Sequence, residues 1–297
     1  MVDERCGGPV PGNEVDPSVA VVGAGVMGTN IATLCLGHGL PVTLVDVDEG
    51  TLDRAKKVIR DQSRLAQLMA SFPVGKTTSE LVTTTSLEDV SEASVVLEAV
   101  TEATEVKAAV LKKVSEITAP GTPLVSNTSS IPIDELADSV SRPEDLIGAH
   151  FMNPAYLIPM VEVVRGSRTG AAAQRTLESL LDQLGRTAVV VRDSPGFVTS
   201  RVLHPMINDA IRVVAEGVAT PADVDALFEG CLGHRTGPLR TADLIGLDNL
   251  ADSLRVLHER TSDVGCIPNP LLLKKVSEGD LGQKSGRGFY EYEVALP

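Results

Sequence analysis

The chain has 297 residues, 43% of them hydrophobic, which is enough for two domains of ordinary size with packed cores. Its formal net charge of −14 disfavours a nucleic-acid-binding protein, because such proteins carry cations that meet phosphates. An apolar run of about 18 residues is absent, so the sequence predicts no membrane span. Four scattered cysteines without a CxxC pair favour free thiols in a reducing cytoplasm, and we expect no metal site.

The N-terminal segment, residues 1–17, is polar, acidic and rich in turn-forming residues, and it lacks the layout of a signal peptide. We expect a flexible leader there. The run SVAVVGAG at 18–25 then predicts a buried strand, 26–39 a helix rich in small residues, and 41–46 a second strand. Together these segments make a compact βαβ unit with parallel strands.

The alternation of helices and strands continues well beyond this unit. Residues 48–72 have the spacing of a long amphipathic helix. Further strands are predicted at 81–85, 94–100, 123–127, 146–152, 160–164 and 187–191. Helical patterns separate most of these strands, which is typical of a doubly wound Rossmann-like α/β domain.

The pattern changes after this region. From Pro195 onward every periodic segment has helical spacing, interrupted by Gly and Pro. The sequence therefore predicts an α/β domain over residues 18–192, followed by an all-α domain over residues 193–297.

Three glycines follow the first predicted strand in the pattern GxGxxG. Gly23 permits a tight turn, Gly25 lets the backbone approach a pyrophosphate, and Gly28 lets helix and strand pack closely. The pyrophosphate would lie at the start of the helix, at Val26 and Met27, where unpaired N–H groups and the helix dipole favour an anion.

An acidic residue, Asp46, stands at the end of the second predicted strand. A carboxylate at this position accepts hydrogen bonds from the adenosine ribose hydroxyls. No Arg or Lys follows it directly in DVDEG, so a 2′-phosphate would meet repulsion. We therefore expect NAD as the cofactor and not NADP. The simpler interpretation is a plain turn with a surface acid, but strand, glycines, helix and acid occur in the required order.

Four further motifs follow in order: SNTSSIPI (126–133), GAHFMNPAYLIPMVEVV (148–164), DSPGFVTSRV (193–202) and GQKSGRGFYEY (282–292). Together with the glycine loop they resemble the 3-hydroxyacyl-CoA dehydrogenase family over residues 18–292. The resemblance implies a Rossmann-like domain followed by a helical domain that dimerises, so we expect a homodimer. It also implies hydride transfer between the C3 alcohol of an acyl thioester and NAD.

The resemblance assigns catalytic roles to a few residues. His150 matches the family's catalytic histidine, Glu162 the glutamate that orients it, and Ser129 a serine that hydrogen-bonds the reacting oxygen. Histidine suits the role of acid and base because its pKa lies near the working pH. An acid among valines, as Glu162 is, needs a partner such as His150. The other histidines, expected to be structural or exposed, are His38, His204, His234 and His258.

The resemblance also extends to the cofactor. Asn153 matches an asparagine near the nicotinamide and the substrate. Glu102 and Lys107 match residues on the nicotinamide side of the cofactor. Lys284 matches a lysine near the C-terminus that reaches toward the cofactor.

At one motif position the chain departs from the family. The family has an asparagine before the arginine of PGFVxNR, where this chain has Ser200. In the family that asparagine fixes the thioester side of the substrate. A serine is shorter and offers one hydroxyl in place of an amide, which puts the substrate in doubt more than the reaction.

The carrier of the acyl group stays open between CoA and an acyl carrier protein. In fatty-acid-oxidising members the helix after the second strand is lysine-rich and helps to hold CoA, whereas here residues 65–72 are neutral. The segment at 237–257 is closer to members that act on carrier-bound hydroxyacyl groups in polyketide pathways. An acidic carrier protein would need a local basic patch on this acidic chain. Candidate residues for such a patch are Arg235, Arg240 and Arg255.

Two alternatives from other classes remain. The first is a dehydrogenase of a free hydroxy acid such as L-gulonate or carnitine. Aromatic residues make up only 3% and Trp is absent, so an aromatic cage for a quaternary ammonium is poorly supplied. The second is a nucleotide-binding protein without turnover, which the presence of both His150 and Glu162 disfavours.

Overall fold

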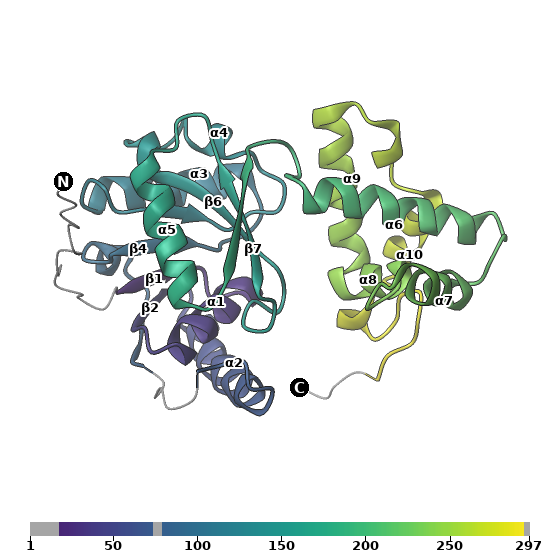
Figure 1. Ribbon diagram of the computed structural model, residues 1–297, viewed down its shortest axis with the longest axis horizontal. Coiled ribbons are helices and arrows are strands. Elements are labelled where there is room, and N and C mark those ends of the chain that lie inside the picture. Colours follow the sequence, from purple (N-terminus) through teal and green to yellow (C-terminus); the bar gives the residue numbers. More distant parts are fainter. Residues whose placement is uncertain (1–17, 74–78, 294–297) are drawn as a thin grey trace, which may run out of the picture.

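The computed structural model describes residues 18–73 and 79–293, which form a sheet-based domain and a helical domain (Figure 1). The predicted leader, residues 1–17, lies outside the described residues. None of the helices in the described ranges is long and apolar enough to cross a membrane.

One eight-stranded sheet has the strand order β3-β2-β1-β4-β5-β6-β7-β8. The strands are β1 (Val19–Val22), β2 (Val42–Val45), β3 (Leu81–Thr84), β4 (Val95–Glu98), β5 (Leu124–Ser126), β6 (Leu146–Phe151), β7 (Met160–Arg165) and β8 (Thr187–Arg192). Strands β1 to β6 are parallel, β7 is antiparallel to β6, and β8 is parallel to β7. The order of the first six strands is that of a Rossmann fold, as predicted.

Helices cover both faces of the sheet, which explains why its inner strands are runs of valine and leucine. One face packs against α1 (Val26–Gly37), α2 (Glu49–Leu68) and α5 (Ala171–Gln183), and the other against α3 (Thr104–Ile117) and α4 (Ile133–Leu136). Side chains of a strand alternate between the faces. In β1, Val19 and Val21 therefore lie with α1, whereas Ala20 and Val22 lie with α3.

The helical domain comprises α6 (Thr199–Ala215), α7 (Pro221–Leu232), α8 (Pro238–Ile245), α9 (Leu247–Thr261) and α10 (Pro270–Ser277). Short 3₁₀ turns complete the structure: η1 (Leu87–Val90), η2 (Pro143–Asp145), η3 (Val264–Cys266) and η4 (Gln283–Ser285). After Arg192 the described residues hold only isolated β-bridges, so the helical prediction is confirmed.

The C-terminal segment folds back onto this domain through a buried carboxylate. Asp243 on α8 is 1% exposed and accepts hydrogen bonds from the N–H groups of Phe289 and Tyr290 and from the hydroxyl of Tyr292. A buried carboxylate is costly unless it is hydrogen-bonded, and these three donors satisfy it.

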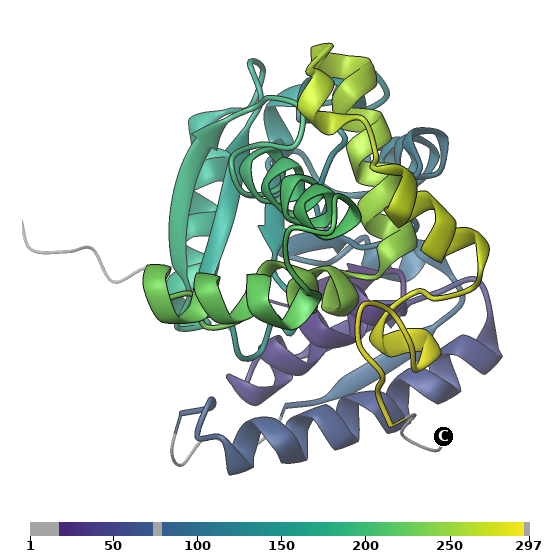
Figure 2. The ribbon, with the colours of Figure 1, turned by 90° about the vertical axis from the view of Figure 1, so that its right-hand side faces the viewer.

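The two domains meet at the start of α6, and Figure 2 views the molecule from the helical side. Phe197, in the link between β8 and α6, is buried in the core of the sheet domain. Arg260 on α9 forms an ion pair with Glu135 on α4. These contacts hold the first turn of α6 against the edge of the sheet.

Candidate active site

The glycine loop lies where the strand order reverses, between β1 and β4. Gly23 has a φ of +102°, and a Cβ at this position would lie 2.6 Å from the carbonyl oxygen of Ala99, just after β4. A Cβ on Gly28 would clash severely with the carbonyl oxygen of Gly23. Both glycines are therefore required by the fold itself.

Gly25 differs, because a Cβ there would meet no protein atom within 4 Å. This open space lies in front of the N-terminus of α1, where the first N–H groups have no partner within the helix. Val26 is 66% exposed and Met27 is half-buried at the same helix start. A pyrophosphate fits this arrangement, because an anion there is met by N–H groups and by the positive end of the helix dipole.

Asp46 is joined directly to the glycine loop. Its Oδ2 accepts a hydrogen bond from the N–H of Ala24 at 2.8 Å, and its Oδ1 accepts one from the N–H of Asp48 at 3.2 Å. The carboxylate thus lies at the end of β2 beside the loop, where it would meet the ribose of a bound dinucleotide.

His150 and Glu162 are direct partners across the antiparallel strands β6 and β7. His150 Nδ1 lies 3.2 Å from Glu162 Oε2, and the two residues are 8% and 6% exposed. Residues directly opposite each other in an antiparallel pair have neighbouring side chains. The register of this single antiparallel pair therefore brings together two residues that are twelve positions apart.

Glu162 is further held by the start of α6. Its Oε1 accepts hydrogen bonds from the N–H groups of Val198 and Thr199 at 2.7 and 3.3 Å. Its Oε2 accepts one from the hydroxyl of Thr199 at 2.6 Å. Burial acts to raise the pKa of Glu162, but the hydrogen bonds from His150, Thr199 and Val198 outweigh it, and the pKa is lowered. Glu162 is therefore ionised at neutral pH.

This ionised partner fixes the tautomer of the imidazole. A carboxylate only accepts hydrogen bonds, so the proton of a neutral His150 ring lies on Nδ1, facing Glu162. The lone pair of Nε2 is then free to accept a proton. Phe197 packs edge-on against the ring, with 6.0 Å between centroids, and limits its movement.

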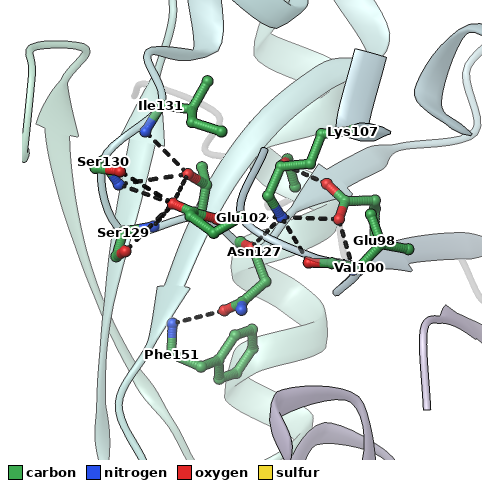
Figure 3. A network of polar contacts seen from close by, with 11 residues as sticks. Glu98, Val100, Glu102, Lys107, Asn127, Ser129, Ser130, Ile131 and Phe151 are labelled. Atoms are coloured by element: carbon green, nitrogen blue, oxygen red, sulfur yellow. Dashed lines mark hydrogen bonds and ion pairs between the residues drawn. The ribbon is translucent and has the colours of Figure 1, made fainter. Parts of the chain in front are cut away.

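Glu102 organises the loop that follows β5, as Figure 3 shows. Its Oε1 accepts hydrogen bonds from the hydroxyl of Thr128 at 2.6 Å, the N–H of Ser129 at 2.8 Å and the N–H of Ser130 at 3.1 Å. Burial acts to raise the pKa of Glu102, but the charge of Lys107 and these hydrogen bonds lower it. The predicted residue Ser129 is half-buried, and its hydroxyl lies 3.2 Å from the same carboxylate oxygen.

Lys107 is completely buried, and Figure 3 shows its ammonium between Glu102 and Glu98. Its Nζ donates to Glu98 Oε1 and to the carbonyl oxygen of Asn127, both at 2.8 Å, and lies 3.4 Å from Glu102 Oε2. The ammonium is thus enclosed by protein acceptors. Lys107, predicted to lie on the nicotinamide side of the cofactor, therefore has no exposed surface of its own and contacts Glu102 instead.

The remaining predicted residues surround this centre less closely. Asn153 is exposed, three positions beyond His150. Lys284 lies on the helical domain, where its Nζ is 2.6 Å from Asp248 Oδ2 at the start of α9. Ser200 is 3% exposed in the first turn of α6.

Two residues near His150 and Glu162 were not predicted as part of the site. Thr199 contacts both members of the pair, since its Oγ1 also lies 3.2 Å from His150 Nδ1. Its only signal in the sequence is its place at the expected start of a helix after PGFV. His204, expected to be structural or exposed, is 7% exposed and near enough to His150 for its pKa to respond to the charge there.

Comparisons with known proteins identify the family. Residues 18–194 match the family described as 3-hydroxyacyl-CoA dehydrogenase, NAD binding domain, and residues 196–292 match its C-terminal domain. A probable 3-hydroxybutyryl-CoA dehydrogenase of Bacillus subtilis is 41% identical over 93% of this chain and 97% of its own.

Two solved structures show the same architecture. FadB2 of Mycobacterium tuberculosis matches with a TM-score of 0.88 and 36% identity, over 93% of this chain and 99% of that one. The (S)-3-hydroxybutyryl-CoA dehydrogenase PaaH1 of Ralstonia eutropha matches with a TM-score of 0.84 and 34% identity, over the same shares. The chain therefore belongs to the 3-hydroxyacyl-CoA dehydrogenase family.

Proposed function

We propose that the chain interconverts 3-hydroxyacyl and 3-oxoacyl thioesters, with His150 as the general acid and base and Glu162 as the residue that orients it. The chain is an NAD-dependent oxidoreductase that acts on a CH–OH group, as its NAD-binding domain and its relatives establish. The observation that carries the proposal is the contact between His150 and Glu162. Because β1 and β6 run in the same direction, this contact and the glycine loop lie at the same edge of the sheet.

The residues of this pair supply the proton chemistry. NAD, when bound, accepts the hydride from C3 of the substrate or returns it. His150 Nε2 takes the proton of the C3 hydroxyl during oxidation and gives it back during reduction. Glu162 stabilises the imidazolium that forms and keeps the ring in the productive tautomer.

The cofactor is held by groups on the carboxyl edge of the sheet. We assign the pyrophosphate to the loop with Gly25 and the first turn of α1, and the adenosine ribose to Asp46. Glu102 and Asn153 are placed on the nicotinamide side. Lys284 would reach the cofactor only if it left Asp248 or shared its ammonium with both.

Two hydroxyls are assigned to the substrate. Ser129 would hydrogen-bond the reacting oxygen, and its half-buried position in the loop organised by Glu102 supports this role. Ser200 would act on the thioester side in place of the family's asparagine. Its small side chain leaves room that a longer amide would fill.

We take CoA as the carrier of the acyl group, since relatives 35–41% identical are named for CoA substrates. One observation favours a carrier protein instead. The last turn of α2 has no basic residue, and Leu68 and Met69 are 85% and 57% exposed there. A second observation speaks against a carrier protein. Arg240, a candidate for the basic patch that such a protein would need, lies over the ring of Tyr290.

We also propose that the protein is a homodimer. A hollow between α6 and α7 is lined mainly by apolar side chains, and Val218 and Leu227 in it are 71% and 58% exposed. Covering such a surface with a second copy of the chain removes it from water. Sedimentation equilibrium of the full chain tests this, and a monomer at micromolar concentration would refute it.

The test of function is NADH oxidation with acetoacetyl-CoA, acetoacetyl carrier protein and free acetoacetate. We expect turnover of the thioesters. His150→Ala should lower kcat by at least about 100-fold and leave NADH affinity nearly unchanged. His234→Ala, at an exposed position in the helical domain, is the matched control.

Three outcomes would decide against the proposal. A His150→Ala enzyme with near-normal rate would remove this residue from the mechanism. Turnover of acetoacetate alone would favour a free hydroxy acid as substrate. NADH binding without turnover of any substrate would favour a non-enzymatic protein.

A further inference from the structure

A second histidine lies on α6, the helix whose first residue contacts His150 and Glu162. His204 stands one helical turn after Ser200, so the two side chains share one face of the helix. Both residues are buried, at 7% and 3% exposure, and the first turn of the same helix contacts Glu162 and His150. The polar side chains of Thr199, Ser200 and His204 therefore follow one another along α6, starting at the contact with His150 and Glu162.

The ring of His204 is held from one side only. Its Nδ1 lies 2.7 Å from the hydroxyl of Ser253 on α9. Within residues 18–73 and 79–293, His204 Nε2 and Ser200 Oγ have no hydrogen-bond partner. Neither of these two unpaired atoms is completely enclosed by the protein. Both atoms therefore keep some exposure to solvent, although their residues are mostly covered.

This histidine is neutral under working conditions. Burial, and then the charge of His150, lowers the pKa of His204 to about 4. At pH 7 the ring thus adds no positive charge beside the catalytic base. A neutral imidazole in this position suits a neutral hydrogen-bonding group of the substrate and gives no electrostatic preference for a carboxylate.

We propose that His204 is a substrate-positioning residue whose Nε2–H, together with the hydroxyl of Ser200, donates to the C1 carbonyl oxygen of the acyl thioester. The inference rests on the proposed function, in which C3 is bound at His150. C1 is only two bonds from C3, so its carbonyl must find partners close to His150. An alkyl group against these two unpaired polar atoms would leave them unsatisfied, which is costly in a buried site.

Ser253 completes the arrangement by setting the tautomer. When its hydroxyl donates to Nδ1, the proton of the neutral ring lies on Nε2, the nitrogen that faces the substrate. Ser253 thus sets the tautomer of His204 as Glu162 sets that of His150, because in each case the partner at Nδ1 determines whether Nε2 carries a proton.

The experiment pairs an enzyme variant with a substrate variant. Acetoacetyl-CoA is compared with its thioether analogue, in which a methylene replaces the C1 carbonyl, for the wild type and for His204→Leu. We expect His204→Leu to lower kcat/KM about 3- to 10-fold with the thioester, mainly through KM, and less than about twofold with the thioether. His204→Gln, which keeps an N–H donor, should recover most of the loss, and Ser253→Ala should show a smaller loss of the same kind.

The controls separate this inference from the function on which it rests. NADH affinity and melting temperature should be unchanged in His204→Gln and Ser253→Ala, and these two variants carry the test if His204→Leu does not fold. Equal losses with thioester and thioether, or a loss confined to kcat, would overturn the role of His204 while the proposed function stands. If the wild-type enzyme turns over no acyl thioester, the proposed function is refuted, and the role of His204 with it.

Discussion

Thr199 Oγ1 donates a hydrogen bond to Glu162 Oε2 at 2.6 Å, so the first residue of α6 contacts the His150–Glu162 pair formed by β6 and β7. The N–H groups of Val198 and Thr199 reach the other oxygen of the same carboxylate. The orientation of Glu162, and through it of His150, therefore depends on how the helical domain is docked. A displacement of α6 would loosen the pair without changing either of its two residues.

Removal of this hydroxyl should impair catalysis more than folding. Thr199→Val loses the hydrogen bond to Glu162 and the contact with His150, and we expect kcat/KM to fall about 10-fold or more, because hydrogen bonds to charged groups are among the stronger ones. Thr199→Ser keeps the hydroxyl and should retain most activity. Equal activity of the two variants would contradict the predicted role of the hydroxyl.

Glu162 should make stability depend on pH on the acidic side. Its pKa in the folded protein is lowered from the ordinary value of 4.5. A group with a depressed folded pKa contributes stability that is complete above its unfolded pKa and is lost as the pH falls through the folded pKa. The free energy of unfolding of the wild type, minus that of Glu162→Gln, should therefore be constant above about pH 5.5 and decrease below pH 4.5.

Urea titrations of both proteins between pH 3 and pH 8 measure this difference. A difference that grows toward acid would contradict a lowered pKa. The same variant should lose activity at neutral pH, because an amide cannot stabilise the imidazolium as a carboxylate does.

The glycines of the loop should separate folding from cofactor binding. Gly28→Ala places a Cβ against the carbonyl oxygen of Gly23, and we expect a loss of about 3 kcal/mol or more in the free energy of unfolding. Gly25→Ala meets no protein atom and should keep the wild-type melting temperature, yet lose NADH affinity about 10-fold or more. Calorimetry and NADH titration check both, and unimpaired NADH binding by Gly25→Ala would place the pyrophosphate elsewhere.

Asp46 should determine the preference for NADH over NADPH. We expect the wild type to prefer NADH by at least about 100-fold in kcat/KM, because a 2′-phosphate beside a carboxylate is repelled. Asp46→Asn removes the charge and keeps an acceptor for the N–H of Ala24. The glycine loop should therefore keep its conformation while the preference for NADH over NADPH decreases. Asp46→Ala loses both the charge and the acceptor for the N–H of Ala24, and NADH binding should weaken as well. Similar efficiency of the wild type with both cofactors would refute the role of Asp46.

Much of the architecture was predictable because local patterns encode it. The valines of β1 and the glycines after it predicted strand, turn and helix, since a parallel strand buried on both faces must be apolar along its whole length. The change to purely helical spacing after Pro195 likewise predicted the second domain. The family, the fold and NAD follow from motifs that are continuous in the sequence, and the comparisons confirm all three.

Contacts between distant segments were not predictable in the same way. Nothing local in TSRVLHP shows that Thr199 reaches Glu162 or that His204 is buried beside Ser253, because both contacts depend on where α6 docks. Lys107 shows the same limit, since a lysine on an exposed-looking helix is usually solvated, whereas here the fold encloses it among three acceptors.

The sequence by itself thus determined the elements, their order and the residue types at the site, because hydrophobic period, turn-forming residues and short motifs act over a few positions. Only the tertiary structure decided which side chains share a proton or a hydrogen bond. Strand register and helix docking set those distances, and both depend on packing between residues that lie far apart in the chain.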